Sequence, residues 1–582
     1  MRDRPWIARY DADVPATMEP YPSETLLDVV RRQALERPDA AALRFEGRVT
    51  TYAELVRQAS AFGRALVERG VKRGDRVALV MPNCPQLIIA ELGTWMAGAV
   101  CAPMNPTYTE DELASVLGRG GAVVAVVLAP FYEHVKAVQK RTAVRHVIVA
   151  HVRDALPFPK SLFFILLRER EGGHGTEPQG GDERMRDVLA THPQVSPAVE
   201  PPRPDDPALL LPSGGTTGTP KLVVGTHGGL AASGRQINAW LGAVLEPGRD
   251  TLLTPLPLFH VYAAAGIQTL AFTAGLSMTL VPNPRDTVAL LATIRRERPA
   301  FICAVPTLLA AIAGHRDTPR TRDAIAAVKL VFCGAAPLMA ETRRGFQSMT
   351  GAVLVEGYSL TEAQMAVIAN PAAGLKKEGS VGLPLPDVML RIVDLETGER
   401  EVATGEAGEV LMSAPQLMQA YWEQPGETAE TMRVDAEGTR WLRTGDVGHL
   451  DADGYLFLTD RKKELIKVSG FQVWPREVEE VLAMHPAVQE SGVAPIADGV
   501  KGERPKAWVV LRPGATATPD ELREHCRAHL AAYKVPVQVA LVPELPKSAI
   551  GKVLRRKLRE LDVVSGGTLP TAASSGAPVA RA

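Results

Sequence analysis

The chain has 582 residues, of which 46% are hydrophobic and 23% are charged, and its formal net charge is −1. This is ordinary globular composition, and the nearly neutral charge implies neither nucleic acid nor an anionic membrane as a partner. The length favours at least two domains. The cysteines are odd in number and lack metal-ligand spacing, so we expect reduced thiols in a cytoplasmic protein; they are Cys84, Cys101, Cys303, Cys333 and Cys526.

No stretch approaches the ~18 consecutive apolar residues that a membrane span needs. The first residues, MRDRPWIARYD, also lack the apolar core of a signal peptide. The nearest approach is 162–167 (LFFILL), between Lys160 and Arg168. We expect this segment to be buried or to form an interface, with shallow membrane contact as the alternative. Peripheral contact at the inner membrane face and a homodimer both stay open on the sequence alone.

The first part of the chain alternates between helical and strand patterns. Thr51 and Glu54 form a capping box, after which apolar residues recur at helical spacing until Gly70. Strands that lack alternation and are separated by helices predict a parallel sheet covered on both faces. Such solid, β-branched runs occur at 76–81, 122–128, 146–150, 251–256, 300–305 and 330–333.

The stretch 213–221 (SGGTTGTPK) follows the apolar run 208–211. A buried strand that breaks into such a loop can turn backbone N–H groups and hydroxyls toward one anion, and a lysine adds charge. The usual P-loop is excluded, because Pro220 precedes the lysine and Leu222 follows it. A phosphate-binding loop and an ordinary surface turn both fit this stretch alone. Its candidate phosphate ligands are Ser213, Gly214, Gly215, Thr216, Thr217, Gly218 and Lys221.

Five later stretches carry groups that a nucleotide needs. Residues 334–337 (GAAP) offer small side chains on which a flat base can lie. Residues 356–362 (EGYSLTE) offer an aromatic face, a hydroxyl and an acid suited to hydrated Mg²⁺. Asp446, which ends an RTGD motif, could accept both hydroxyls of a ribose. Two basic, glycine-bearing turns complete the set, at 460–472 (DRKKELIKVSGFQ) and 546–552 (PKSAIGK).

The predicted secondary structure also changes along the chain. From about Asp387, short strands joined by Asp/Gly turns predict a small β-rich, barrel-like section. Beyond residue 460, a helix starting at Pro475, a strand at 507–511 and a helix near 521–530 predict an α+β unit of about a hundred residues. The end of the chain is rich in Gly, Ser, Ala and Pro and almost uncharged, which is typical of disorder.

Each of these motifs alone has an ordinary explanation, such as a turn with a packed ring or a solvated basic face. Together and in this order they resemble the adenylate-forming superfamily of acyl-CoA synthetases, luciferases and adenylation domains. The similarity runs from about Leu26 to about Arg559. Marks most similar to AMP-forming long-chain fatty-acid–CoA ligases lie at 105–110 (NPTYTE), 257–262 (PLFHVY), 357–362 (GYSLTE) and 545–555 (LPKSAIGKVLR).

The resemblance implies a reaction in two steps. A carboxylic acid, here a medium- or long-chain fatty acid, attacks Mg·ATP to give acyl-AMP and pyrophosphate, and the thiol of coenzyme A then displaces AMP. An aryl-acid or 4-coumarate-type CoA ligase is the alternative, as is a ligase that delivers acyl-AMP to a carrier protein. A luciferase-like oxygenase and a non-catalytic sensor on this fold have less support. Two departures keep the aryl alternative open. Leu222 stands where most relatives carry glycine, and Ser359 stands where many fatty-acyl enzymes carry glycine.

The resemblance also assigns roles to residues of the first step. It implies catalytic roles for Lys552, His260, Thr217 and Glu362, with Thr217 and Glu362 placing Mg²⁺. Lys552 would bridge the α-phosphate and the attacking carboxylate, and His260 would lie between the acyl carboxylate and the thiol tunnel unless it is only part of a pocket wall. The ATP and AMP site would comprise the loop residues above with Gly334, Ala335, Ala336, Glu356, Gly357, Tyr358, Ser359, Thr361, Asp446, Arg461, Lys467 and Lys552.

For the second step the resemblance implies that a small C-terminal domain swings about Lys463. That swing would bring Lys467, Gly470, Phe471 and Gln472 to the thiol channel. The expected organisation is therefore α/β: an adenylating domain of parallel sheets, helices and a β-rich section over 1–460, a mobile α+β domain over 461–563, and a disordered tail over 564–582.

Overall fold

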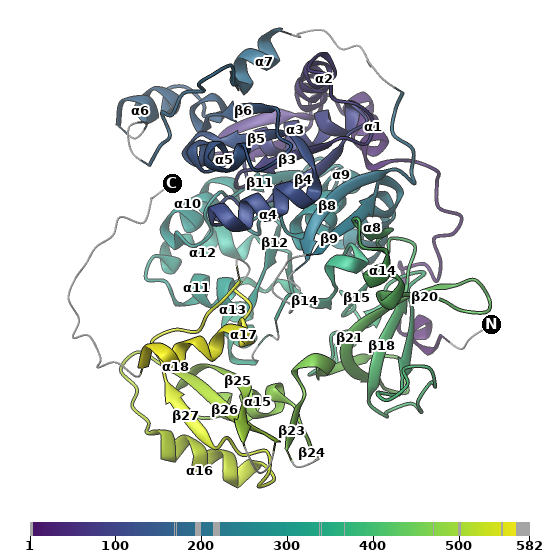
Figure 1. The fold of residues 1–582 in the computed structure, drawn as a ribbon, viewed down its shortest axis with the longest axis vertical. Helices are drawn as coiled ribbons and strands as arrows, with labels where there is room; N and C mark the ends of the chain where they lie inside the picture. Colours follow the sequence, from purple (N-terminus) through teal and green to yellow (C-terminus); the bar gives the residue numbers. More distant parts are fainter. Residues whose placement is uncertain are drawn as a thin grey trace.

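The computed structural model describes residues 4–565, apart from 168, 170–171, 192–199, 214–220, 337, 339, 366, 469–470, 499–501 and 549–550. Over these residues the chain forms four sheets, two of them large and mostly parallel. Figure 1 shows the two large sheets together in the upper body, an antiparallel sheet to one side and a small domain below. The predicted α/β class, with a large N-terminal part and a small C-terminal domain, is confirmed.

The first large sheet buries both of its faces. In β3, Val77 and Leu79 belong to the central core, whereas Ala78 and Val80 belong to a second core on the opposite face. This explains why the strand reads as a solid apolar run without alternation. The strand order is β19 (Ala420–Tyr421), β9 (Lys221–Thr226), β8 (Pro207–Ser213), β4 (Val100–Met104), β3 (Arg76–Val80), β5 (Ala122–Leu128), β6 (His146–Ala150) and β7 (Glu183–Arg184).

The second large sheet positions two of the predicted motifs. Strands β13 and β14 pair in parallel, with Cys333 opposite Glu356, so the loops that follow them open at the same edge. The carboxyl edge of a parallel sheet is where α/β proteins bind ligands. The strand order is β16 (Leu383–Pro384), β15 (Ile368–Ala369), β14 (Val353–Tyr358), β13 (Leu330–Cys333), β12 (Phe301–Ala304), β10 (Thr251–Thr254), β11 (Ser277–Leu280), β1 (Ala41–Phe45) and β2 (Arg48–Thr51).

Helices alternate with the strands of both large sheets. The side chain of Thr51 accepts the backbone N–H of Glu54 and caps α2, which ends just before Gly70 as predicted. The helices are α1 (Leu26–Glu36), α2 (Tyr52–Glu68), α3 (Pro85–Met96), α4 (Glu110–Gly120), α5 (Tyr132–Gln139), α7 (Met185–Thr191), α8 (His227–Leu241), α9 (Gln268–Ala274), α10 (Thr287–Glu297), α11 (Pro306–Gly314), α12 (Thr318–Ala326) and α13 (Ala340–Thr350).

The predicted β-rich section is a five-stranded antiparallel sheet. Its central strand β21 pairs with β22 so that Asp446 lies opposite Arg461. The strands are β17 (Met389–Val393), β18 (Gly408–Ser413), β20 (Met432–Val434), β21 (Arg440–Leu450) and β22 (Leu456–Arg461), and α14 (Pro425–Thr431) precedes β20.

The small domain has a core of its own, built around Ile466, Val478, Val509 and Leu522. A short 3-10 turn (Lys462–Glu464) joins it to β22, and Lys463 in this turn is exposed. Its strands are β23 (Ile466–Val468), β24 (Phe471–Val473), β25 (Val488–Asp498), β26 (Gly502–Leu511) and β27 (Gln538–Leu541), and its helices are α15 (Pro475–Ala483), α16 (Pro519–His529), α17 (Arg555–Leu558) and α18 (Glu560–Ser565).

The apolar segment 162–167 departs from the sequence expectation. It lies in helix α6 (Lys160–Leu167), no residue of which is buried, so the expectation of a buried segment is wrong. The helix contacts the short helix η3 (Val152–Ala155) at the outer edge of the first large sheet, and no further layer of the described chain covers it. Of the helices that the structure describes, none has the length and apolarity to cross a bilayer. The first two residues of the predicted tail, 564–565, end helix α18, and 566–582 lie outside the described residues.

Candidate active site

The loop after β13 has the small, open surface that a flat base requires. Ala335 and Ala336 are exposed there, and Ala335 has a φ of +68°. The facing strand end comes very close: a Cβ on Gly357 would lie 2.3 Å from Cζ of Phe332 and 2.9 Å from the carbonyl oxygen of Ile368. Only glycine fits that position. Gly334 is similarly close to the carbonyl of Gly357, at 3.3 Å from a built Cβ.

Tyr358, Asp446 and Arg461 form a connected group beside this surface. The Tyr358 hydroxyl donates to one carboxylate oxygen of Asp446, and Nε of Arg461 donates to the other at 3.0 Å. Burial and the neighbouring Asp446 carboxylate raise the pKa of Tyr358 well above its usual value. The structure thus joins three predicted residues from two different sheets, and Asp446, at 5% exposure, keeps a small open surface.

Lys552 lies on a tight loop of the small domain, where the charges of Arg461 and Asp446 influence its pKa. Gly551, with a φ of +79°, donates to the Ser548 carbonyl at 2.9 Å, and Ser548 donates to the Lys552 carbonyl at 2.8 Å. A Cβ on Gly551 would lie 3.0 Å from Oγ1 of Thr307 in the first turn of α11, so the loop touches the large domain. Lys552 is exposed. Crowding by the protein, and then the Arg461 charge, lower its pKa.

His260 lies close enough to Lys552 for the ammonium charge to affect the imidazole. Burial lowers the pKa of His260 to about 4, and the charge on Lys552 contributes in the same direction. The imidazole is therefore neutral at neutral pH, and its Nδ1 accepts the backbone N–H of Tyr262 at 3.2 Å. The Tyr262 hydroxyl in turn donates to the Phe332 carbonyl at 3.0 Å. His260 thus sits on a turn anchored to the site edge of the second sheet.

Sequence reasoning missed a residue that links the end of the predicted phosphate loop to Glu362. The hydroxyl of Tyr421 donates to Oε1 of Glu362 at 2.8 Å, and Nζ of Lys221 lies 4.8 Å from the centroid of the Tyr421 ring. Lys221 also forms an ion pair with Glu427. Tyr421 lies on the two-residue strand β19, whose sequence carries no recognisable motif, so only its pairing with β9 could reveal it.

The predicted phosphate loop is described only at its ends. Ser213 ends β8, is 6% exposed and pairs across a hairpin with Lys221. The predicted ligands between them, including the proposed metal ligand Thr217, lie outside the described residues. Leu222 has a structural explanation: it is buried in β9 and belongs to the second core, where apolar bulk stabilises the sheet.

The chemistry of Glu362 fits Mg²⁺ carried by a nucleotide. Its carboxylate supplies the hard oxygen that Mg²⁺ prefers, and this ion usually takes one or two carboxylates together with phosphate oxygens and water. Among the described residues, no group of three or more His, Cys, Asp or Glu is arranged to hold a metal ion by itself. A shared site, completed by phosphates, is therefore the arrangement that these residues suit.

The remaining predicted nucleotide residues occupy the same edge with ordinary partners. Glu356 forms an ion pair with Arg343 of α13. The Ser359 hydroxyl donates to the Leu360 carbonyl at 3.3 Å, and Thr361 opens the 3-10 turn Thr361–Ala363 that carries Glu362.

The residues expected to serve the thiol step lie on the β23–β24 hairpin of the small domain. Lys467, Phe471 and Gln472 are exposed there, and the Phe471 ring stacks on Tyr533 with 4.8 Å between centroids. Among the described residues, the hydrogen bond of Lys467 with Glu503 and the ring contact of Phe471 stay within the small domain, and neither contact involves the Tyr358 group. Gly470 lies outside the described residues.

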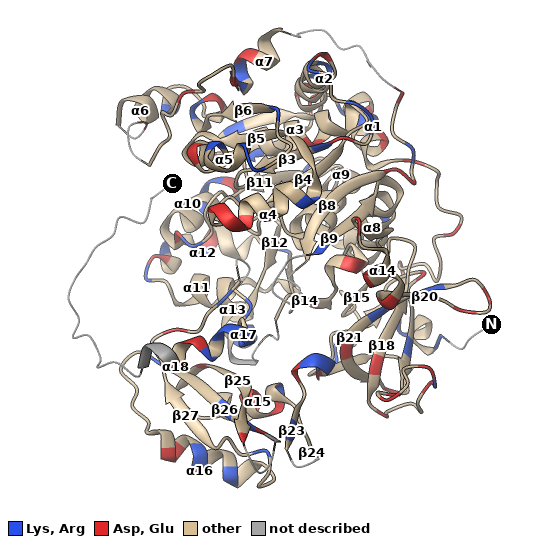
Figure 2. Cartoon of the chain, viewed as in Figure 1, with Lys and Arg blue, Asp and Glu red and all other residues tan. Residues whose placement is uncertain are grey.

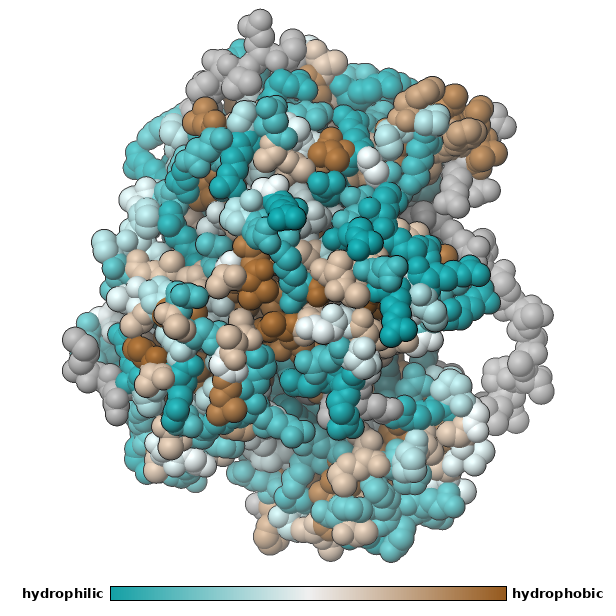
Figure 3. Space-filling model, turned by 180° about the vertical axis from the view of Figure 1, so that it is seen from behind, coloured by the Kyte–Doolittle hydropathy of each residue, from teal (hydrophilic) through white to brown (hydrophobic). Residues whose placement is uncertain are grey.

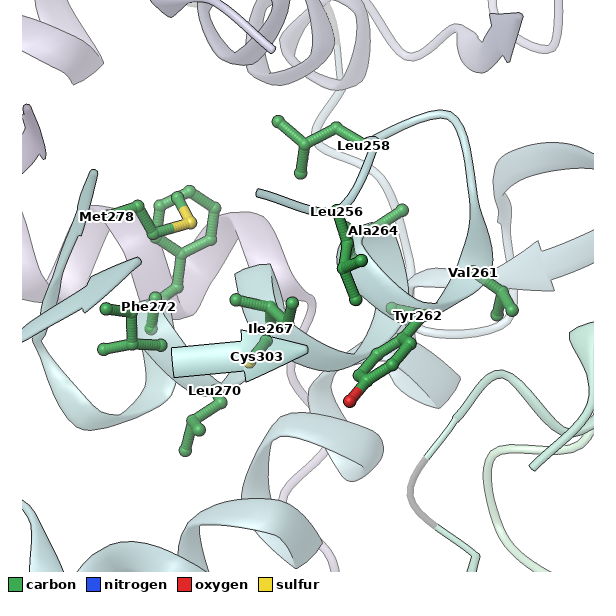
Figure 4. Close-up of a cluster of buried hydrophobic side chains, with 14 of the residues drawn as sticks. Leu256, Leu258, Val261, Tyr262, Ala264, Ile267, Leu270, Phe272, Met278 and Cys303 are labelled. Carbon is green, nitrogen blue, oxygen red and sulfur yellow. The ribbon is translucent and has the colours of Figure 1, made fainter. Parts of the chain in front are cut away.

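A small apolar cavity of about 30 Å³ lies behind Tyr358 and Tyr262. The side chains that line it come mainly from strands β12 to β15 of the second sheet and from the helical segments 237–241 and 262–270. Figure 4 shows part of this cluster, with Tyr262, Ile267, Leu270 and Cys303 gathered together. The sequence pointed only to the small residues after His260. The lining residues are Ile237, Trp240, Leu241, Tyr262, Gly266, Ile267, Leu270, Phe301, Cys303, Phe332, Tyr358, Met365, Ile368, Ala369 and Leu385.

The chain is a two-domain α/β enzyme. It has two large, mostly parallel sheets, a small domain with its own core, and a polar group of residues on the side that faces the small domain. The model of the AMP-binding enzyme family matches residues 30–422, and the model of the AMP-binding enzyme C-terminal domain matches residues 477–552. The chain therefore belongs to the AMP-binding enzymes of the adenylate-forming superfamily, which confirms the resemblance of its motifs.

Relatives match nearly the whole chain. A long-chain-fatty-acid–CoA ligase of Bacillus subtilis (strain 168) is 35% identical over 564 residues, covering 96% of this chain and 98% of that protein. One of Yersinia pestis is 36% identical over 574 residues, covering 97% and 99%. Among solved structures, the anthranilate CoA ligase AuaEII in complex with anthranoyl-AMP matches with a TM-score of 0.80 and 26% identity, covering 95% of this chain and 99% of that chain.

Proposed function

We propose that this protein is an AMP-forming fatty-acyl-CoA synthetase, which converts a fatty acid, ATP and coenzyme A into acyl-CoA, AMP and pyrophosphate. The observation that carries the proposal is the connected group of Tyr358, Asp446 and Arg461 beside an apolar cavity that Tyr358 also lines. The charges of Arg461 and Asp446 also act on Lys552 of the small domain. Tyr358 thus belongs both to the candidate nucleotide group and to the candidate acyl cavity.

In the first step the chain must bring an anion to a polyanion, which requires fixed positive charge and oriented donors. Asp446 accepts the ribose hydroxyls, Tyr358 and the 334–336 surface hold adenine, and Arg461 neutralises phosphate. Lys552 holds the carboxylate and the α-phosphate together as a positioned charge rather than a proton carrier. Mg²⁺, when bound, would screen the phosphates next to Glu362 and Thr217.

In the second step Lys552 must leave so that a thiol can approach. The division into a domain over 1–460 and a mobile domain over 461–563 provides for this, with the turn at Lys463 as the hinge. Hinges at the ends of elements absorb such φ/ψ changes in few residues. The exposed hairpin with Lys467, Gly470 and Gln472 would then line the thiol channel, and the neutral His260 would face the acyl carbonyl.

The apolar lining of the cavity supports a fatty acid as the substrate. A buried ammonium or a second carboxylate would need a polar partner there, and the cavity wall consists of aliphatic, aromatic and sulfur side chains with the hydroxyls of Tyr262 and Tyr358 already hydrogen-bonded. An aryl acid is the second candidate, because a flat ring also suits an apolar wall and the anthranilate CoA ligase shares the fold.

A pyrophosphate-release assay over a panel of acids tests the proposal. We expect release with palmitate-like acids, with steady turnover only when coenzyme A is present. Release confined to benzoate-like acids would establish the aryl alternative. The absence of release with every carboxylate would refute the enzyme hypothesis.

Helix α6 supports a finer proposal: the protein works in the cytoplasm at the inner face of a membrane. Its apolar side chains are strongly exposed, reaching 71% for Leu167 and 68% for Leu166, and Figure 3 shows them as a brown patch at the upper right. Phe158 and Phe163 extend the patch. An all-round apolar helix next to a basic residue at each end, Lys160 and Arg168, suits a shallow lipid interface, where fatty acids also partition. A homodimer that covers α6 is the competing occupant.

A further inference from the structure

The junction between the two domains is bridged by one arginine that contacts three carboxylates. Arg555 donates to Glu479 through Nε at 3.0 Å and through Nη2 at 2.6 Å. Its Nη1 donates to Asp460 at 3.0 Å and also pairs with Glu464. The Arg555 side chain is largely buried, and that of Asp460 is 4% exposed. Figure 2 shows basic residues both on the segment that joins β22 to β23 and on α17, which begins with Arg555.

These three carboxylates lie on different sides of the hinge turn. Asp460 precedes Lys463 and belongs to β22, whereas Glu464 and Glu479 follow it and move with the small domain. Glu479 is further fixed there, since its Oε1 accepts the backbone N–H of Val493 at 2.8 Å. A rotation at Lys463 therefore breaks the contact of Arg555 with Asp460 and preserves its other two.

Asp460 holds a second group of the small domain. Its Oδ2 accepts the backbone N–H of Arg476, in the first turn of α15, at 2.8 Å. A carboxylate at a helix N-terminus is stabilised by the unpaired N–H groups and the helix dipole. The Arg476 guanidinium also donates back across the junction, to the Leu458 carbonyl at 3.0 Å.

Arg555 is tied directly to the loop that carries Lys552. Leu554 donates to the Pro546 carbonyl at 2.8 Å, which closes the loop just before Arg555. Lys547 and Val553 also form an isolated β-bridge across its base. A force that holds Arg555 against Asp460 therefore sets where this loop meets Thr307.

We propose that Asp460 holds the small domain in the orientation of the acyl-AMP step, and we call its contacts with Arg555 and the start of α15 the clasp. These contacts position Lys552 until the small domain turns. The inference rests on the proposed two-step function. When the clasp opens, Arg555 keeps its contacts with Glu464 and Glu479. Its guanidinium therefore stays paired, whereas an unpaired buried charge would strongly oppose the rotation. Asp460 and Arg555 are positioning residues, since neither is placed in contact with substrate.

A cysteine pair can report the orientation without any substrate. A Cβ built on Gly551 lies 3.9 Å from Cβ of Thr307, which is within the range of a disulfide. We therefore suggest combining Thr307→Cys with Gly551→Cys; the cysteines of the natural chain are all buried. The strain of a side chain at φ +79° is the same in every background, so relative cross-linking rates report the population of this orientation.

Asp460→Asn in this background should lower the cross-linking rate several-fold. Glu477→Gln is the matched control, because it removes an ion pair of the same helix α15, with Lys534 at 2.5 Å, that stays within the small domain. That control should cross-link at the parental rate. An unchanged rate in Asp460→Asn would overturn the clasp.

The second readout separates the half-reactions in the chain without added cysteines. Asp460→Asn should slow acyl-AMP formation by about tenfold, the effect of one lost hydrogen bond to a charged group. Thioester formation from supplied acyl-AMP should be unchanged or faster. Equal loss in both steps would indicate general damage and contradict the proposal. Since cross-linking needs no substrate, it tests the clasp even if the pyrophosphate assay refutes the proposed reaction.

Discussion

Nε of Arg461 lies 3.0 Å from Oδ1 of Asp446, because the two residues face each other on the paired strands β21 and β22. The same carboxylate accepts the Tyr358 hydroxyl from another sheet, 88 residues away in the chain. The Asp446 carboxylate thus orients a cation and an aromatic ring at once. Both would face the nucleotide in the proposed reaction.

Asp446→Asn should therefore weaken nucleotide binding. One amide oxygen cannot accept from Arg461, Tyr358 and a ribose as a carboxylate does, so we expect KM for ATP to rise about tenfold to a hundredfold. Steady-state kinetics measure it. Asp435→Asn is the control, because Asp435 lies in the same section and pairs with Arg391 at 2.9 Å, apart from the Tyr358 group. Equal KM values in both variants would refute the assignment.

Lys552→Ala should lower the rate of acyl-AMP formation by about a hundredfold or more, which is the usual cost of losing one preorganised charge. Thioester formation from supplied acyl-AMP should be largely spared, because in the proposed mechanism Lys552 leaves the site before the second step. Lys552→Arg should not restore the first step, since the planar guanidinium cannot occupy the place of a compact ammonium. Lys547→Ala, on the same loop and paired with Glu490, serves as the control. Equal loss of both steps would contradict the swinging-domain account.

Gly266→Leu should shorten the acids that the cavity accepts. A Cβ at Gly266 would lie 3.1 Å from Cγ of Met365, a flexible side chain, so a larger residue projects into the cavity. We expect kcat/KM for a palmitate-like acid to fall by at least about tenfold, with a short acid much less affected. Thermal unfolding shows whether the fold persists. If long and short acids lose equally, the cavity is not the acyl site.

The loss of folding stability at acid pH should depend on His227. Burial lowers the pKa of His227 to about 4, so below the usual value of 6.5 the unfolded chain binds a proton that the folded chain does not. Stability contributed by the neutral ring is present above pH 6.5 and is lost as the pH falls toward 4. His227→Gln should reduce this slope by up to about 1.4 kcal/mol per pH unit. Urea unfolding at several pH values measures it, and an unchanged slope would refute the assignment.

Replacing Leu166 and Leu167 of α6 by Gln should weaken binding to anionic phosphatidylglycerol vesicles. Each leucine is worth about 1.5–3 kcal/mol when fully buried in lipid, so the loss should be at least about tenfold in a sedimentation assay. Leu35→Gln changes a strongly exposed leucine of α1, at 84% exposure, and controls for general apolarity. If the natural chain ignores vesicles but forms a dimer that the double variant loses, the patch is a protein interface.

Local pattern predicted many elements well. The runs 122–128 and 146–150 became β5 and β6 without change of bounds, because solid β-branched segments have few alternatives to a buried parallel strand. Only the burial of segment 162–167 was predicted wrongly. Its apolarity is local, but burial depends on whether another layer lies above it, and none of the described chain does.

The nucleotide motifs could be found from residue types because the chemistry demands them: small residues for a base, an acid for ribose, a lysine on a glycine loop. Tyr421 could not, since its value lies in contacts with Glu362, 59 residues away, and with Lys221. Asp460 was visible as part of a motif, yet its partner Arg555 stands 95 residues further on. Leu222 appeared as a departure from pattern and proved to be a core residue.

The sequence by itself determined the α/β class, the family and most of the groups that carry charge in the proposed reaction, because these depend on residue type and on order along the chain. The tertiary structure decided which of those groups meet. Asp446 binds Arg461 and Tyr358, and Asp460 binds Arg555. Strand register and domain packing bring these residues together, so the contacts depend on how distant segments fold. The orientation of the small domain, and with it the place of Lys552, exists only in three dimensions.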